Sequence, residues 1–298
     1  MRKCAPAKVR AHAARRWPWH GGAHYHSPVS LTPSFDAYSP REIAQRVQDV
    51  CLVKSRLSLL QLVMLGLLAG GFIGLGALFS VIVQSDGSLG FAAQRVLSGV
   101  VFSLGLLLVV VAGAELFTGN NLLAMAWADG CMPTRDLLKN WIVVCLANFA
   151  GAAGLAAVVF LSGHAAMNAG AIGRTYVQIA VAKSSLSLAE AFFRGVLCNV
   201  LVCMAVWMSL AGRSVTDKFI AIVFPVSAFV AAGFEHSIAN MYLFPLATML
   251  QAAAGQPVEL AWLWRNLLPV IAGNLVGGSV LVALVYYVIY RRGTTGGG

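Results

Sequence analysis

The sequence predicts an all-α polytopic membrane protein, with six transmembrane helices arranged as two inverted three-span repeats and with the second and fifth helices broken. Hydrophobic residues make up 59% of the 298 residues and charged residues make up 11%, whereas soluble proteins carry about 25% charged residues. The mean hydropathy is +0.77, and several apolar stretches exceed the roughly 20 residues that span a bilayer. Together these observations exclude a soluble domain.

Two stretches of the same build predict the helix breaks. In each, a glutamate precedes an asparagine by five residues inside an apolar run: Glu115 and Asn120 in the first, Glu235 and Asn240 in the second. Charged groups at membrane depth face a partner or a cavity, and non-helical backbone is tolerated there only where it is buried in protein or lines a cavity. We therefore expect these four residues to have structural roles at the breaks.

A wider repeat accompanies the two breaks. Asn140 and Asn148 recur as Asn266 and Asn274, 126 residues later in both cases. A repeat with an odd number of spans must insert its second copy upside down. Inverted repeats with discontinuous helices that meet near the membrane midplane are a transporter and channel architecture.

The part of the chain that precedes the first span is basic. Residues 1–38 form an N-terminal extension that we expect to be a disordered cytoplasmic segment, the alternative being an arginine-rich targeting segment. Residues 39–56 predict an amphipathic interfacial helix, with Ser39 as its N-cap and Pro40 at its first position. Its apolar face comprises Ile43, Val47 and Val50.

Residues 57–290 form the predicted six-span transport domain, and residues 291–298 form a cytoplasmic C-terminal tail. The longest connection between spans, 162–187, is predicted to be a loop. The spans are expected at 57–83, 91–115 with the half-span 120–128, 137–161, 188–210, 219–249 with its break at His236, and 262–290. Glycines in the first span recur at spacings that favour close helix packing; they are Gly66, Gly70, Gly71, Gly74 and Gly76.

The net charge of +10 follows membrane topology and does not indicate a nucleic-acid-binding face. Ten of the 21 lysines and arginines precede residue 57; with the N-terminus inside, 16 lie on the inner side and five on the outer side. Because positive residues concentrate in inner loops, both termini are expected to be cytoplasmic. The six cysteines form neither a CxxC pair nor a metal-ligand spacing, so no metal site and no cofactor are expected.

Three further motifs, together with Lys183, carry a resemblance to a known family. They are the segments 114–119 (Ala-Glu-Leu-Phe-Thr-Gly), 194–207 and 233–241 (Gly-Phe-Glu-His-Ser-Ile-Ala-Asn-Met). In order and spacing they resemble the signatures of the formate/nitrite transporter family, and of its formate-type branch, over about residues 33–290. The resemblance implies an aquaporin-like six-span protomer that assembles as a homopentamer with one pore in each protomer.

The resemblance also implies roles for individual residues. His236 matches the central pore histidine, Thr118 the hydroxyl that reaches toward it, and Asn199 a polar neighbour on the fourth span. Lys183 matches the basic residue of the anion vestibule. The apolar constriction residues correspond to Phe102, Leu106, Leu116, Phe117 and Phe229.

We therefore expect a multi-pass channel or transporter of the cell inner (plasma) membrane that moves small monovalent weak-acid anions with a proton. Lys183 would attract the anion, and the apolar ring would make a bare charge costly and raise the pKa of the anion. His236 would relay the proton, because the reference pKa of histidine is about 6.5.

Formate is the first candidate substrate and nitrite the second, and hydrosulfide and lactate also fit. The expected partners are the anion, protons, the lipid bilayer and the other subunits of a homopentamer, but no nucleic acid.

The same residues are also compatible with plainer structural roles. His236 would alternatively be a satisfied core histidine, Lys183 an ordinary loop lysine and Asn199 a cross-brace between helices, while Phe102 and Phe229 would be core aromatics. A function of a different class, an intramembrane enzyme, would pair Ser103 or Ser237 with His236. No nucleophile motif and no paired carboxylates accompany these serines, so we expect the protein not to be an enzyme.

Overall fold

The computed structural model describes residues 36–258 and 260–292; the predicted extension over residues 1–35 and the end of the predicted tail, 293–298, lie outside the described residues. Six helices in the described part are long and apolar enough to cross a membrane, and the chain is a multi-pass membrane protein. These candidate spans are Leu59–Gln84, Phe91–Gly113, Thr134–Leu161, Leu188–Ser209, Val215–Ala232 and Leu263–Tyr290. The predicted all-helical class with six spans is confirmed.

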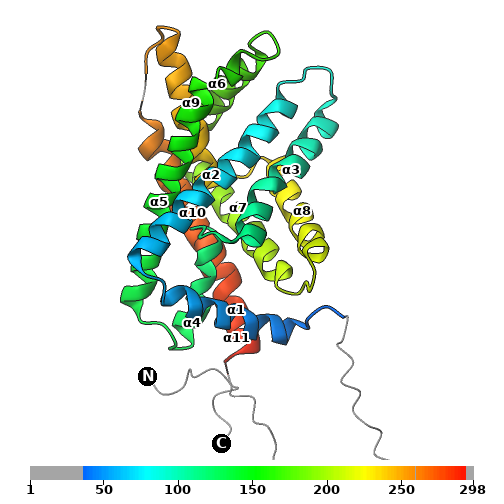
Figure 1. The fold of residues 1–298 in the computed structure, drawn as a ribbon, viewed down its shortest axis with the longest axis vertical. Helices are drawn as coiled ribbons and strands as arrows, with labels where there is room; N and C mark the ends of the chain where they lie inside the picture. The colour runs from blue at the N-terminus through cyan, green and yellow to red at the C-terminus, as the bar shows by residue number, and fades with distance from the viewer. Residues whose placement is uncertain (1–35, 259, 293–298) are drawn as a thin grey trace, which may run out of the picture.

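The helices follow one another through short connections (Figure 1). In the first half they are α1 (Pro40–Ser55), α2 (Leu59–Gln84), α3 (Phe91–Leu108) with the π-helical turn η1 (Val109–Gly113), η2 (Gly119–Leu122), α4 (Leu123–Ala128) and α5 (Thr134–Leu161). In the second half they are η3 (His164–Ala166), α6 (Ala171–Ser184), α7 (Leu188–Ser209), α8 (Val215–Ala232), α9 (Ser237–Ala253), η4 (Leu263–Leu267), α10 (Leu268–Leu275), η5 (Val276–Leu284) and α11 (Val285–Tyr290).

The two helix breaks lie where the glutamates predict them. After α3 and η1 the chain is non-helical from Ala114 and resumes with η2 and α4. After α8 the break begins at Gly233, which has a φ of +75°, a left-handed conformation that glycine adopts without steric cost. From the breaks, α4 and α9 extend toward opposite ends of the molecule (Figure 1). The opposite orientation of the two halves in a bilayer stays a prediction.

The connection predicted as a loop between the third and fourth spans contains a helix, so that prediction is wrong. α6 occupies Ala171–Ser184. Its buried residues Ile172, Tyr176 and Ala180 follow one another at four-residue intervals, the spacing of one helix face. The Tyr176 hydroxyl lies 2.8 Å from that of Tyr242 in α9. This apolar stripe is short, and the polar residues around it obscure it in the sequence.

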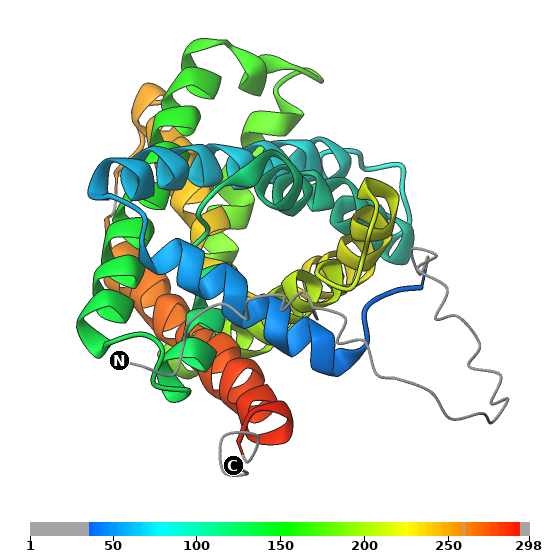
Figure 2. The same cartoon turned by 60° about the horizontal axis from the view of Figure 1, so that its bottom comes forward.

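α1 packs on protein, and it lies across the ends of the other helices (Figure 2). Ser39 caps it with a capping box to Glu42, and Pro40 is at the first position. The predicted apolar face of α1 is wrong at Val50, which is 38% exposed, and Cys51 is buried in its place. Arg291, which follows α11, contacts α1 and donates to Gln45 Oε1 at 2.6 Å.

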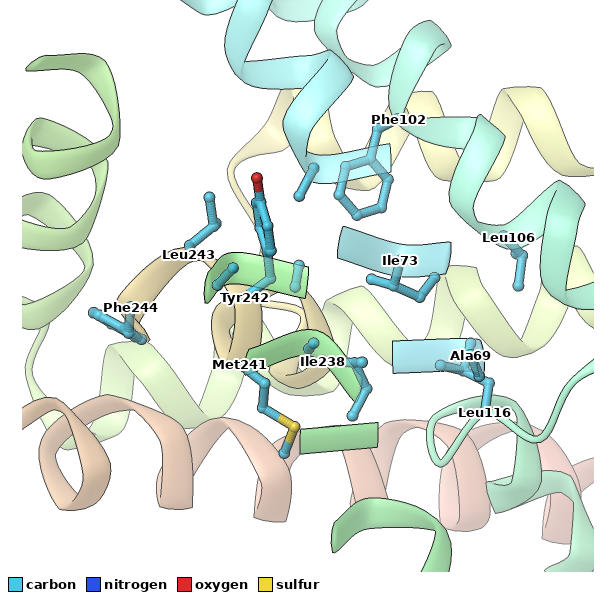
Figure 3. Packing of buried hydrophobic residues seen from close by; sticks show 14 of the residues in the cluster. Ala69, Ile73, Phe102, Leu106, Leu116, Ile238, Met241, Tyr242, Leu243 and Phe244 are labelled. Atoms are coloured by element: carbon cyan, nitrogen blue, oxygen red, sulfur yellow. The ribbon is translucent and has the colours of Figure 1, made fainter. Parts of the chain in front are cut away.

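The buried core lies between α2, α3, α5, α8 and α9. Figure 3 shows Phe102 and Leu106 of α3, Ile73 of α2, and Ile238 and Tyr242 of α9 in this cluster. The helices approach closely because glycines line their contacts. A Cβ on Gly70 would overlap the carbonyl oxygen of Asn148 in α5, but a Cβ on Gly71 would meet no atom within 4 Å. Gly71 therefore has no packing partner among the described residues of this chain.

The neighbouring glycines of α2 allow a matched test of helix packing. We expect Gly70→Ala to lower the melting temperature of the detergent-solubilised protein, because the new methyl group forces α2 away from α5 at a cost of about 1–3 kcal/mol. Gly71→Ala should leave the melting temperature unchanged or raise it, because alanine favours helix without a clash. Equal melting shifts in the two variants would contradict a specific packing role for Gly70.

Candidate functional site

The centre of the site joins the two helix breaks through one side-chain contact. His236 Nε2 lies 3.1 Å from Thr118 Oγ1, and both residues are buried, with 3% and 0% of their surfaces exposed. His236 is the N-cap of α9, and its Nδ1 accepts the backbone N–H of Ala239 at 3.1 Å. A neutral imidazole has one donor and one acceptor nitrogen. The hydrogen-bond network therefore assigns the proton of neutral His236 to Nε2, which points at Thr118.

Two phenylalanines cover the His236 ring. The rings of Phe229 and His236 are stacked, with centroids 5.9 Å apart and an interplanar angle of 20°. Phe102 meets Phe229 edge-on at 5.6 Å and His236 at 6.5 Å. Phe229 comes from α8 and Phe102 from α3, so the trio closes the space between the fifth and second spans.

Cavities lie on both sides of this centre. On the α6 side, a cavity of about 230 Å³ is lined by Arg95, Phe102, Lys183, Phe229, Glu235 and His236, among others. On the α1 side, a larger cavity of about 590 Å³ is lined by Cys51, Lys54, Leu106, Glu115, Leu116 and other residues. Burial raises the pKa of the Cys51 thiol to about 12, so this residue adds no negative charge to the wall.

A buried ion pair holds the second break. Lys183 Nζ, at the end of α6, donates to Glu235 Oε1 at 2.8 Å. Asn240 Nδ2 donates to Glu235 Oε2 at 2.7 Å and to Asn266 Oδ1 at 2.8 Å. The Glu235 side chain is 3% exposed. Its carboxylate is thus held by a side chain of the neighbouring helix α6 and by one of α9.

A second ion pair of the same design holds the first break. Lys54 Nζ in α1 lies 3.0 Å from Glu115 Oε1 and donates to Asn120 Oδ1 at 2.7 Å. Asn120 Nδ2 donates to Glu115 Oε2 at 2.7 Å and to Asn140 Oδ1 at 2.9 Å. This gives Glu115 and Glu235 equivalent surroundings.

Sequence reasoning missed Lys54 because a lysine before the first span is the ordinary mark of the membrane edge. A signal was nevertheless present. The segment 54–59 reads Lys-Ser-Arg-Leu-Ser-Leu, and the segment 183–188 reads Lys-Ser-Ser-Leu-Ser-Leu. Because the repeat includes these segments, α1 corresponds to α6, and Lys54 corresponds to Lys183.

Two asparagines brace the non-helical segments in matching ways. Asn148 of α5 accepts the backbone N–H of Phe117 at 2.9 Å and donates to the carbonyls of Gly66 and Glu115. Asn274 of α10 accepts the N–H of Ser237 at 3.0 Å and donates to the carbonyls of Gly195 and Glu235. Buried backbone groups without partners are costly, and these amides supply the partners that the interrupted helices lack.

Asn199 acts as a brace between the two breaks. Its Nδ2 lies 3.2 Å from the carbonyl oxygen of Thr118, 2.7 Å from that of Asn274 and 2.7 Å from Asn121 Oδ1. Neither cavity is lined by Asn199. It therefore holds the backbone that carries Thr118, as a cross-brace between helices does.

The structure thus distributes the predicted site residues over three positions. Thr118 and His236 meet at the centre. Lys183, Phe102 and Phe229 line the α6-side cavity, whereas Leu106 and Leu116 line the α1-side cavity. Phe117 is buried at 2% exposure and borders neither cavity.

Comparisons with known proteins show which family and which solved structures this chain resembles. Residues 41–288 match the family model described as formate/nitrite transporter. The chain is 36% identical to the formate channel FocA of Escherichia coli strain K12 over 274 residues, which cover 87% of this chain and 96% of that protein. It resembles a solved pentameric formate channel with formate bound, with a TM-score of 0.72 and 34% identity over 78% of this chain and 97% of that chain. It also resembles a solved FNT family ion channel, with a TM-score of 0.75 and 28% identity over 83% and 98% of the two chains.

The Lys54–Glu115 pair generates a stability prediction. We expect Lys54→Met to lower the melting temperature, because it leaves a buried carboxylate without its cation at a cost of up to about 3 kcal/mol. The double variant Lys54→Met/Glu115→Gln should recover much of the loss, because both charges are then absent. Arg56→Met, which removes an exposed charge two residues away, is the control. A melting shift in the control as large as in Lys54→Met would show that the pair is not responsible.

Proposed function

Because this chain belongs to the formate/nitrite transporter family, we propose that it is a pore for formate, with each anion crossing the membrane together with a proton. The coarser function, a formate/nitrite-type anion channel, follows from the family. The observation that supports the finer proposal is the buried Thr118–His236 contact between two cavities. Nitrite is the second candidate, because it is also a small monovalent anion of a weak acid.

The apolar ring formed by Phe102 and Phe229 supports transport of a neutral acid. Phe102 and Phe229 are 6% and 3% exposed, and with His236 they line the α6-side cavity, which Thr118 does not line. A bare anion that enters this apolar ring loses its hydration, which is costly in a low dielectric. The same surroundings raise the pKa of a weak acid. Formate therefore takes up a proton at the ring and passes the ring as formic acid.

The central pair is complementary to a protonated carboxylic acid. The Nε2–H of His236 donates to the carbonyl oxygen of the acid, and Thr118 Oγ1 accepts from its O–H. His236 relays a proton at Nε2, because Nδ1 is engaged by the Ala239 amide. As Nε2 passes its proton to formate, it takes the hydroxyl proton of Thr118, and Thr118 takes a proton from water in the cavity, so that the imidazole stays neutral. The acid ionises again in the cavity on the far side.

The proposal extends to assembly and orientation. We propose a homopentamer in the inner (plasma) membrane, which accords with the pentameric formate channel that the fold resembles. With α1 and the C-terminal Arg291 on the cytoplasmic side, the α6-side cavity faces outward, in the orientation favoured by the charge distribution. Native mass spectrometry and protease protection of α1 in sealed vesicles test these two points.

An intramembrane hydrolase finds no support in the same geometry. A serine nucleophile needs a hydrogen bond to its histidine base. Ser103 donates to the Gly99 carbonyl at 3.1 Å, and both His236 nitrogens are engaged by Ala239 and Thr118.

The main test is stopped-flow flux in proteoliposomes across a panel of monovalent anions. Formate and nitrite should move with protons, and their flux should rise as the external pH falls. Chloride and nitrate, the conjugate bases of strong acids, should permeate poorly. Wild-type protein that carries chloride as readily as formate, without proton movement, would overturn the proposal.

The relay role of His236 is tested by His236→Asn. Asparagine can still accept the Ala239 amide as an N-cap, so the pentamer should stay intact by size-exclusion chromatography. Because an amide does not exchange its proton as imidazole does, formate-linked proton flux should fall about 100-fold, a typical contribution of a positioned proton donor. Flux equal to wild type in an intact variant would contradict the relay.

The barrier role of the apolar ring is tested by Phe229→Ala. A wider and wetter ring lowers the desolvation cost for a bare ion, so the ratio of nitrate to formate flux should rise. Truncation of a buried phenylalanine also costs about 3–5 kcal/mol of stability. Phe244→Ala is the matched control, since Phe244 is buried and stacks on Trp262 away from both cavities. If both variants lose stability and neither changes selectivity, Phe229 is only a core residue.

A further inference from the structure

In the α6-side cavity, Lys183 supplies no net positive charge that could attract an anion. Lys183 lines this cavity, but its ammonium group lies 2.8 Å from Glu235, and the pair has no net charge. The other cations in the wall are Arg95 and Arg194. Arg194 interacts electrostatically with Glu190, one helical turn earlier in α7. Arg95 has no hydrogen bond or ion pair with an acidic side chain among residues 36–258 and 260–292.

Arg95 is held in place by the helix break that carries His236. Its Nε donates to the carbonyl oxygen of Ala231, in the last turn of α8, at 2.9 Å. The final carbonyls of a helix lack partners within the helix, and a cation there also interacts favourably with the helix dipole. A Cβ placed on Gly233 would lie 2.8 Å from an Arg95 terminal nitrogen. The guanidinium group thus packs directly over the left-handed residue that ends α8.

Arg95 also lies in line with the constriction. It precedes Phe102 by seven residues on α3, which places the two residues on one face with their Cα atoms about 10.5 Å apart along the helix axis. Ser98, between them, lines the same cavity. An anion held at Arg95 therefore lies in the same cavity as Phe102.

We propose that Arg95 is the residue that first binds the anion in the α6-side cavity, and that it selects planar oxyanions. Because Nε is engaged by Ala231, the two terminal nitrogens remain to form parallel hydrogen bonds. Such a fork matches the two oxygens of a carboxylate and adds geometric specificity to charge attraction. Formate and nitrite present two oxygens in this geometry, but hydrosulfide and chloride do not. This inference rests on the proposed transport function and adds a binding residue to it.

The test compares Arg95→Gln and Arg95→Lys by the half-saturating concentrations of formate and hydrosulfide in proteoliposomes at low salt. Arg95→Gln removes the charge, so both values should rise about fivefold, the upper end for a solvent-exposed charge pair. Arg95→Lys keeps the charge but lacks the fork. It should raise the formate value about threefold and leave the hydrosulfide value within about twofold. The maximal rates should change little, and the effect of Arg95→Gln should shrink at 1 M salt, where screening acts over about 3 Å.

The control is Arg174→Gln, which removes an exposed arginine at the same end of the molecule. Formate values that rise equally in Arg174→Gln and Arg95→Gln would overturn the site, because general surface charge would then be responsible for the effect. Unchanged half-saturating concentrations of formate in both Arg95 variants would also overturn the site. If Arg95→Gln fails to assemble, the half-saturating concentrations of Arg95→Lys alone test the proposal. Equal effects of Arg95→Lys on both anions would refute selection by the fork. Wild-type protein that moves neither anion would instead refute the proposed function itself.

Discussion

A carboxylate inside an apolar bundle is stable only when a cation lies against it, and this protein meets that requirement twice. Lys54 neutralises Glu115 and Lys183 neutralises Glu235. Each carboxylate also accepts from an asparagine of the restarted helix. These contacts fix the two interrupted segments, and the interrupted segments place Thr118 and His236 within hydrogen-bond distance. The ion pairs therefore fix the geometry of this centre together with the amides of Asn148, Asn199 and Asn274.

The histidine at the centre has both a structural and a chemical role. As the N-cap of α9 it satisfies a backbone amide through Nδ1, and this bond leaves Nε2–H directed at Thr118. One local backbone requirement thus selects the tautomer in which Nε2–H faces Thr118. The stacked Phe229 restricts rotation of the ring and keeps water from one of its faces.

Much of this architecture could be predicted from the sequence, because its signals are local. Apolar length predicts the spans, and the Glu-to-Asn spacing predicts where two of them break. Other features depend on contacts between distant segments. Lys54 resembles a simple marker of the membrane edge because its partner, Glu115, lies far along the chain. Asn199 sits on an apolar helix, and only the fold shows that its amide bonds to the carbonyls of Thr118 and Asn274. α6 gives a weak signal because its buried stripe is brief.

The order of the paired residues along the chain bears on biosynthesis. In each half the lysine precedes its glutamate, Lys54 before Glu115 and Lys183 before Glu235. Because chains are made from the N-terminus and domains fold as they emerge, each cation has already been translated when its acid reaches the membrane. A chain whose translation began after residue 54 would insert Glu115 with no such partner, although it would retain all six spans. The short helix ahead of the first span is therefore part of the membrane domain's own assembly.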